Sequence, residues 1–101
     1  MRIIAKSTLV KFWEKHPAAK SPLEEWYNYV KRANWKNLND ITESISNSRS
    51  INEGRVIFKI GGNNYRLIVE IKFAISAVYI VFVGTHAEYD KIDPKTVFKV
   101  N

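Results

Sequence analysis

The side chains best suited to chemistry gather in one short segment, residues 84–91. His86 and Tyr89 are three residues apart, so a helical turn would place both on one side, with Glu88 and Lys91 nearby. Histidine titrates near neutral pH, at about 6.5 when unperturbed, and can act as acid or base. Tyrosine can stack on a base, donate a hydrogen bond or take part in proton transfer. This set fits cleavage of an RNA phosphodiester by its own 2′-hydroxyl, which needs a base, an acid and cations at the phosphate.

The cations that this chemistry needs lie in a predicted β-hairpin. Residues 61–64, Gly-Gly-Asn-Asn, are a strong turn signal, and the strands on either side place Arg55 opposite Glu70 and Lys59 opposite Arg66. Alternation puts these four side chains on one face and only apolar side chains on the other. Like charges opposed across strands are destabilising, so a bound anion would explain Lys59 and Arg66, unless both simply extend into water. Arginine can hold phosphate oxygens in bidentate fashion.

A second turn, at 74–77, would connect this hairpin to a third strand. It would pair Phe73 with Val78 and therefore Arg66 with Thr85, although the turn lacks glycine and specifies its register less strongly. The segment that starts at His86 would then converge with the two cations on one open sheet face. The candidate catalytic residues are Arg66, His86 and Tyr89, and the candidate RNA- or phosphate-binding residues are Lys59, Lys91 and Arg55.

Each candidate also has an ordinary structural explanation. A histidine after a strand is more often a hydrogen-bonded turn residue than a catalyst, and Tyr89 could cover the core edge. His16 falls near a helix C-terminus, where a protonated ring interacts favourably with the helix dipole. The three tryptophans are assigned to the core. Two isolated histidines and no cysteine predict no metal site, and no phosphate loop or other cofactor motif is present, so no cofactor is expected.

The elements that must position these residues predict an α+β domain of order β-α-α-(α)-β-β-β, a sheet that carries its helices on one face. Ser7 is the expected N-cap of the first helix, and residues 21–24, Ser-Pro-Leu-Glu, form the capping box of the second. The chain as a whole, 1–101, is expected to be one domain, with 94–101 as an added strand or a loose tail. The predicted elements are a short strand within 1–5, helices at 7–16, 21–33 and 37–46, strands at 55–60, 65–73 and 78–83, and a helical turn at 85–93.

Composition narrows the class of protein. A chain of 101 residues allows one domain, and the absence of cysteine fits a reducing compartment. Sixteen Lys and Arg against ten Asp and Glu give a net charge of +6, which favours an anionic partner such as nucleic acid. No signal peptide is visible, and the longest apolar stretch contains Glu70 and Lys72, which predicts strands rather than a membrane span. A cytoplasmic protein is expected.

Several ordered blocks of the sequence carry a family resemblance. The chain resembles the HigB-type toxins of the RelE superfamily over most of its length. The blocks are Phe-Trp-Glu-Lys-His-Pro at 12–17, Leu-Glu-Glu-Trp-Tyr at 23–27, Ala-Asn-Trp at 33–35, the hairpin at 55–67, and Phe-Val-Gly-Thr-His-Ala-Glu-Tyr-Asp-Lys-Ile at 82–92.

The resemblance implies a compact RelE-like fold and a metal-independent mRNA endonuclease that works on translating ribosomes by 2′-hydroxyl attack. It also implies a helix-turn-helix antitoxin of the HigA type, through which alone the pair would contact its operon DNA. Arg66 then corresponds to the sheet arginine at the phosphate, His86 and Tyr89 to the acid/base and base-stacking residues, and Lys59 and Lys91 to supporting cations. RelE itself relies more on arginine, lysine and tyrosine than on histidine, and the tail 94–101 has no counterpart.

Two other functions remain open on the sequence. A non-catalytic RNA- or ribosome-binding module of the same fold would block translation without producing new RNA ends. A structural partner-binding domain would not be toxic, and its binding would depend little on salt, whereas RNA binding weakens steeply as salt rises.

Overall fold

The first half of the chain folds mainly into helices and the second half into a sheet, as the sequence predicts. The computed structural model describes residues 1–52 and 54–97. Predicted and observed elements agree to within a few residues, apart from one additional strand. In chain order they are β1 (Arg2–Ile4), α1 (Lys6–Lys15), a 3-10 turn (Pro17–Ala19), α2 (Lys20–Arg32), α3 (Leu38–Ser44), β2 (Ser48–Asn52), β3 (Arg55–Ile60), β4 (Tyr65–Lys72), a 3-10 turn (Phe73–Ile75), β5 (Ala77–Thr85) and α4 (His86–Tyr89).

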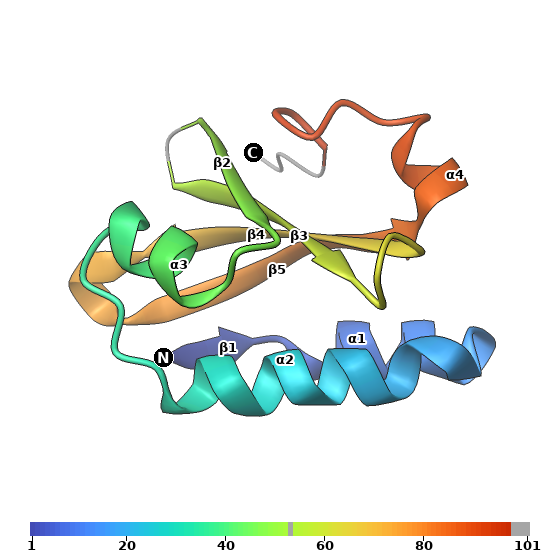
Figure 1. Ribbon diagram of the computed structural model, residues 1–101, viewed down its shortest axis with the longest axis horizontal. Helices are drawn as coiled ribbons and strands as arrows, with labels where there is room; N and C mark the ends of the chain where they lie inside the picture. Colours follow the sequence, from blue (N-terminus) through green and yellow to red (C-terminus); the bar gives the residue numbers. More distant parts are fainter. Residues whose placement is uncertain (53, 98–101) are drawn as a thin grey trace.

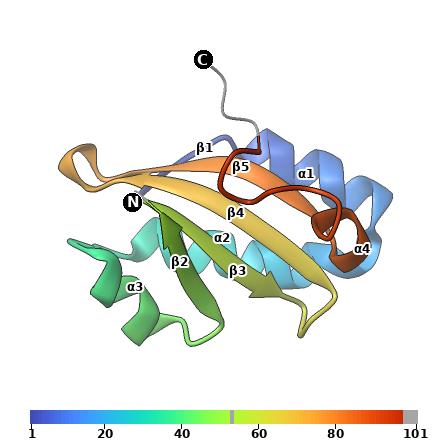
Figure 2. The same cartoon turned by 90° about the horizontal axis from the view of Figure 1, so that it is seen from above.

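The five strands form one sheet in the order β1-β5-β4-β3-β2, with β1 parallel to β5 and the other neighbours antiparallel (Figure 2). Helices α1 and α2 cover one face, whereas α4 and the chain after it lie over the other (Figure 1). This arrangement confirms the predicted α+β class. None of the helices in the described part of the chain is long and apolar enough to cross a membrane.

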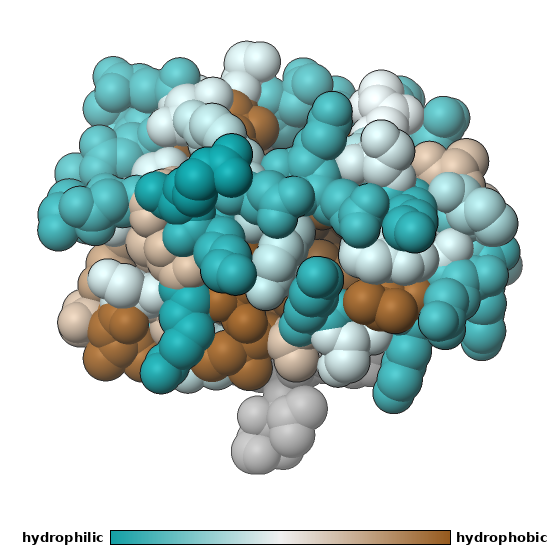
Figure 3. Space-filling view, turned by 90° about the horizontal axis from the view of Figure 1, so that it is seen from below, coloured by the Kyte–Doolittle hydropathy of each residue, from teal (hydrophilic) through white to brown (hydrophobic). Residues whose placement is uncertain are grey.

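The two N-terminal helices begin differently from the prediction. Ser7 lies inside α1, whose N-cap is Ala5, and no side chain caps it. Helix α2 begins at Lys20, because its N–H donates to the Pro17 carbonyl and the 3-10 turn leads directly into the helix. The predicted capping box at Ser21 is therefore wrong. The outer face of these helices is largely hydrophilic, with hydrophobic patches in the lower half of the view in Figure 3.

The core lies between the helices and the apolar face of the β3–β4 hairpin. The hairpin has the predicted register, with Arg55 opposite Glu70 and Lys59 opposite Arg66. Full burial of one large apolar side chain contributes roughly 1.5–3 kcal/mol, so a one-residue slip of this register would be costly. The core includes all three tryptophans, as predicted, and its buried members are Leu9, Trp13, Ala19, Leu23, Trp26, Val30, Trp35, Ile41, Val56, Phe58, Ile60, Leu67, Val69, Ile71 and Val78.

The register of β4 with β5 corrects the prediction by one residue. Arg66 lies opposite Gly84, and Tyr65 lies opposite Thr85. The connection is a 3-10 turn that ends on Ser76 in the left-handed conformation, at φ 51°, rather than the expected four-residue turn. An irregularity in β5 then shifts the pairing at its middle. Arg66 therefore faces a residue without a side chain.

The second face of the sheet is more covered than the sequence indicated. Ile57 and Ile68 on this face are buried, and the chain after α4 returns over it (Figure 1). The described part of this segment, up to residue 97, forms turns rather than the possible added strand. Residues 98–101, which complete the predicted strand or tail, lie outside the described residues.

Arg55 holds this covering segment in place. Its Nη1 donates to the carbonyl oxygens of Pro94 and Val97, each at 3.0 Å, and its Nε lies 3.2 Å from Glu70 Oε2. The Arg55 side chain is only 5% exposed. The predicted ion pair with Glu70 is confirmed, and the covering segment accepts both hydrogen bonds from Nη1.

Candidate active site

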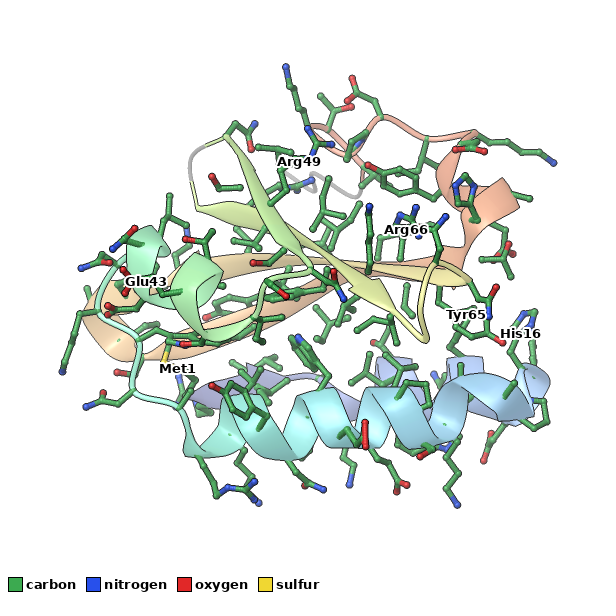
Figure 4. The ribbon with its side chains drawn as sticks, viewed as in Figure 1. Met1, His16, Glu43, Arg49, Tyr65 and Arg66 are labelled. Atoms are coloured by element: carbon green, nitrogen blue, oxygen red, sulfur yellow. The ribbon has the colours of Figure 1, made fainter. Side chains whose placement is uncertain are left out.

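A cavity of about 390 Å³ lies on the sheet face that α4 borders; we call it the active-site cavity. It is open to one side and combines cations with one aromatic ring. Figure 4 shows Arg49 and Arg66 on this side of the sheet, away from α1 and α2. None of the described residues that line it is acidic. The lining residues are Ser46, Asn47, Ser48, Arg49, Ile57, Lys59, Arg66 and Tyr89.

Arg66 is the most firmly positioned charge in the cavity. Its Nη1 donates to the carbonyl oxygens of Asn63, at 3.1 Å, and Tyr65, at 3.3 Å, and its Nη2 donates to Asn63 Oδ1 at 2.8 Å. No described carboxylate forms a salt bridge with it, although it is only 6% exposed. Asn63 thus occupies the end of the guanidinium, and the edge formed by Nε and the second N–H of Nη2 is left to hold an anion in bidentate fashion.

Two further cations flank Arg66. Lys59 lies directly opposite it on β3 and is exposed. Arg49 is exposed on β2, where it pairs with Ile57 and so shares the face of Lys59. Within the described residues, neither has a salt-bridge partner. Three positive charges without a neutralising carboxylate repel one another, and a phosphate between them would relieve that repulsion.

Tyr89 contributes the aromatic wall, and a short helix positions it. Thr85 and Glu88 form a reciprocal capping box at the start of α4, at 3.1 Å and 2.8 Å. The His86 backbone N–H donates to the Asn64 carbonyl at 3.0 Å, which ties α4 to the β3–β4 turn. The Tyr89 ring then lies with its centroid 5.5 Å from the Arg66 guanidinium carbon, a cation–π contact. A half-buried ring at the wall of a cationic cavity can stack on a base or hydrogen-bond a sugar or phosphate oxygen.

His86 lies beside the cavity rather than in its lining. Its side chain is 47% exposed, and Nδ1 lies 3.1 Å from Asp90 Oδ2. The Asp90 carboxylate holds the orientation of the ring through Nδ1, and no described contact occupies Nε2. Because His86 and Tyr89 are three residues apart on α4, the histidine flanks the tyrosine at the cavity rim.

The structure separates two predicted residues from this group. Lys91 is exposed but lines a different groove, between α1 and the edge of β5. Arg55 is buried in its contacts with Glu70 and the covering segment, and it is absent from the cavity lining. The geometry brings together Lys59, Arg66 and Tyr89.

Arg49 is the residue that the sequence reasoning missed. Strands were expected only after Ser50, whereas β2 begins at Ser48 and pairs with β3. The available signal was that of a short hairpin, because the polar segment around Ile51 is followed by a glycine, Gly54, just before β3. In the structure Gly54 adopts a positive φ of 80°. Glycine is the residue that adopts such a conformation without strain.

The arrangement supports acid–base and electrostatic catalysis on a phosphate. The described residues contain no cluster of three or more His, Cys, Asp or Glu side chains that could hold a metal ion. Arginine and lysine can stabilise charge on a phosphorane, while Tyr89 and His86 offer groups that can exchange protons.

Comparison with known proteins gives a consistent family match. Residues 19–92 match the model of the HigB_toxin family, described as the RelE-like toxic component of a toxin–antitoxin system. An mRNA interferase HigB from Escherichia coli O6:H1 (strain CFT073) is 26% identical over 94 residues, which are 91% of this chain and 91% of the relative. The mRNA interferase toxin HigB of Escherichia coli K12 is 29% identical over 93 residues, 89% of this chain and 88% of the relative.

Proposed function

Because the chain belongs to the HigB toxin family, the RelE-like toxic components of toxin–antitoxin systems, we propose that it cuts mRNA on the ribosome through attack of the RNA's own 2′-hydroxyl. The family that the sequence resembles is thereby confirmed. The enzyme class follows from relatives that are named mRNA interferases: the chain is an endoribonuclease of this class. Beyond this class, we propose that the activity depends on the ribosome and that the 2′-hydroxyl attacks, and we propose which residues carry out the reaction.

The observation that supports the mechanism is the cation group on the cavity face. Arg66, with one edge of its guanidinium available, and Lys59 would hold the oxygens of the scissile phosphate and stabilise the charge that develops there. The 2′-oxygen loses its proton and attacks phosphorus, and the 5′-oxygen leaves with a proton. The products are a 2′,3′-cyclic phosphate and a 5′-hydroxyl end.

The proton carriers are assigned from α4. Tyr89 would contact the bound RNA directly, because its ring lines the cavity beside Arg66. His86 would transfer a proton from the rim, with Asp90 holding its ring. Lys91, exposed beyond α4, would bind a more distant phosphate. Arg55 supports the site by holding the covering segment rather than by binding RNA.

The partners follow from the same reasoning. The net charge of +6 suits contact with ribosomal RNA as well as with mRNA. A toxin of a toxin–antitoxin system has an antitoxin, and we propose a helix-turn-helix protein of the HigA type, through which alone the pair would contact DNA. An enzyme that acts on translating ribosomes works in the cytoplasm.

The experiment that tests this function is mapping of RNA 5′ ends after a short induction of the wild-type chain and of the Arg66→Ala variant. New 5′-hydroxyl ends in translated regions, absent in the variant, are the expected result. Ends that also appear when translation initiation is blocked would contradict the need for the ribosome.

Two outcomes would favour the other functions. Growth arrest without new RNA ends would indicate a non-catalytic binder of RNA or ribosomes. Absence of toxicity, with partner binding that is insensitive to salt, would indicate a structural domain.

A further inference from the structure

A second cavity, of about 460 Å³, lies on the opposite side of the sheet edge from the active-site cavity. It lies between α2, the segment before β2 and the end of β3. We propose that this cavity, which we call the nucleobase groove, binds a base of the same RNA strand that the active site cuts. The inference rests on the proposed RNA-cutting function and adds to it a binding site that selects among bases.

The two cavities are continuous around the edge of the sheet. They share Ser46, Asn47 and Lys59 in their linings. The Lys59 N–H donates to the Asn47 carbonyl at 3.0 Å, and the paired part of β2 begins one residue later, at Ser48. Among the described residues, the end of β3 therefore extends beyond the first paired residue of β2 and has no neighbouring strand on the β2 side. A single strand held at Arg66 can pass over this edge beside Lys59 and enter the groove.

The groove offers an aromatic platform. Tyr29 lines it and is 45% exposed, although large apolar side chains are usually covered. Successive bases of single-stranded RNA stack on such rings, and this contact tolerates any base. An exposed tyrosine in a groove that joins the cationic cavity is therefore a reason for a base to bind at this place.

The groove also contains a hydrogen-bond donor without a partner. Trp26 lines it, is 5% exposed, and its Nε1 has no hydrogen-bond partner among the described residues. An indole N–H is only a donor, and buried polar groups are normally hydrogen-bonded. The N–H itself is buried, so a carbonyl oxygen or ring nitrogen of a base would supply the missing acceptor once the groove wall shifts to expose it.

Charge decides between a base and a phosphate as the occupant. Glu25 lines the groove, and Lys59, at its boundary with the active-site cavity, is its only described cation. A carboxylate repels phosphate but accepts hydrogen bonds from the amino groups of bases. The adjoining cavity next to Tyr29 is lined by two carboxylates, Asp40 and Glu43, and one cation, Arg32, so its lining carries a net negative charge. The phosphates of the RNA would therefore lie along Lys59 and Arg66, while one base would point into the nucleobase groove between Tyr29 and Trp26.

The first test measures binding of short single-stranded 2′-O-methyl oligonucleotides, which cannot be cut because the 2′-oxygen carries a methyl group. Homopolymers of A, C, G and U are titrated by fluorescence anisotropy into the wild type, Tyr29→Ala and Trp26→Phe. Loss of one base stack should raise the Kd of Tyr29→Ala by about five-fold or more. Trp26→Phe keeps an aromatic six-membered ring but removes the N–H, so it should reduce the differences in affinity among the four homopolymers.

Matched controls separate binding from folding. Ile75→Ala removes another exposed apolar side chain, on the β4–β5 connection, and Trp13→Phe changes another buried tryptophan that lies outside the groove lining. Both should bind as the wild type does, and circular dichroism should show all four variants folded.

The second test maps the bases around cut sites on translating ribosomes. If the wild type produces no RNA ends, the proposed function is wrong. If the wild type cuts, and both groove variants cut at the same sites and bind the four homopolymers as it does, the function stands and the nucleobase groove is wrong. Variants that keep RNA binding but lose an antitoxin would likewise overturn the inference, since the groove would then belong to a protein partner.

Discussion

Arg66 combines three properties at the level of the single residue: near-complete burial, a fixed orientation and no neutralising carboxylate among the described residues. Asn63 fixes the orientation of the guanidinium, and the Tyr89 ring lies against it in a cation–π contact. A charge held in this way needs no reorganisation when a phosphate arrives, which is the condition for strong electrostatic catalysis.

Arg66→Lys should lower the single-turnover cutting rate by about 100-fold or more, because lysine keeps the charge but loses the planar, bidentate edge. The measurement is cleavage of mRNA on ribosomes programmed in vitro. Arg32→Lys, an exposed change on α2, should leave the rate unaltered. An R66K protein that cuts at the wild-type rate contradicts the role of the bidentate contact.

His86→Gln should lower the single-turnover cutting rate by about 100-fold, because an amide cannot transfer a proton as an imidazole does. Asp90→Asn keeps the imidazole and alters only its acceptor, so its loss of rate should be smaller. A His86→Gln protein that cuts at the wild-type rate shows that another group carries the proton.

Arg49→Gln should weaken RNA binding and lower the slope of log K against log salt by about 0.7, the value for one phosphate contact to a single strand. Lys36→Gln, exposed and outside the cavity lining, serves as control. Lys91→Gln measured in parallel shows whether RNA reaches beyond α4. An unchanged slope for Arg49→Gln excludes Arg49 from the phosphate path.

Helix α4 is a small element on which the proposed activity depends. It has only four residues, and the Thr85–Glu88 capping box holds its start while Tyr89 ends it. So short a helix has little stability of its own, and its side chains are placed by its caps and its contacts with the sheet.

Thr85→Ala should cost about 1 kcal/mol of unfolding free energy, the value of an N-cap, and should lower the cutting rate more than this modest destabilisation explains. The reason is that Tyr89 loses its fixed place beside Arg66. Urea unfolding and single-turnover cleavage, compared with Thr8→Ala on α1, provide the two numbers. If Thr85→Ala and Thr8→Ala lose cutting rate in the same proportion to their loss of unfolding free energy, α4 does not position the site.

The sequence could predict the elements that have a strong local pattern. The β3–β4 register follows from one purely apolar face and a glycine turn, so the pairing of Lys59 with Arg66 was predictable. The β4–β5 register was not, because the 3-10 turn, the left-handed Ser76 and the irregularity in β5 have no sequence signature of comparable strength. Strand β2 was missed because an edge strand of mostly polar residues resembles a loop, and Arg49 was missed with it.

At the level of the whole molecule, the two ends of the chain cover opposite faces of the sheet. The N-terminal helices cover one face, and the segment after α4 covers the other (Figure 1). Sequence reasoning left that second face open, because no local pattern indicates that Arg55 reaches Pro94 and Val97. Such contacts, about forty residues apart, depend on the fold as a whole.

Arg55→Leu should lower the free energy of unfolding by roughly 1–3 kcal/mol and make the segment after α4 more sensitive to protease, because two carbonyls and Glu70 lose their partner. RNA affinity of the folded fraction should change little. Lys72→Leu, which removes only the exposed contact to Glu70, serves as control. A loss of RNA affinity without a loss of stability would instead assign Arg55 to the phosphate path.

The β3–β4 turn has a consequence for how cells escape the toxin. Asn63 holds the guanidinium of Arg66, and the next residue, Asn64, holds the first amide of α4. Two parts of the site thus share one anchor, in a turn where Gly61 and Gly62 adopt positive φ. Colonies that survive induction of the toxin should therefore carry mutations at residues 61–64 nearly as often as at Arg66 itself. Many of these inactive variants should still fold and bind an antitoxin.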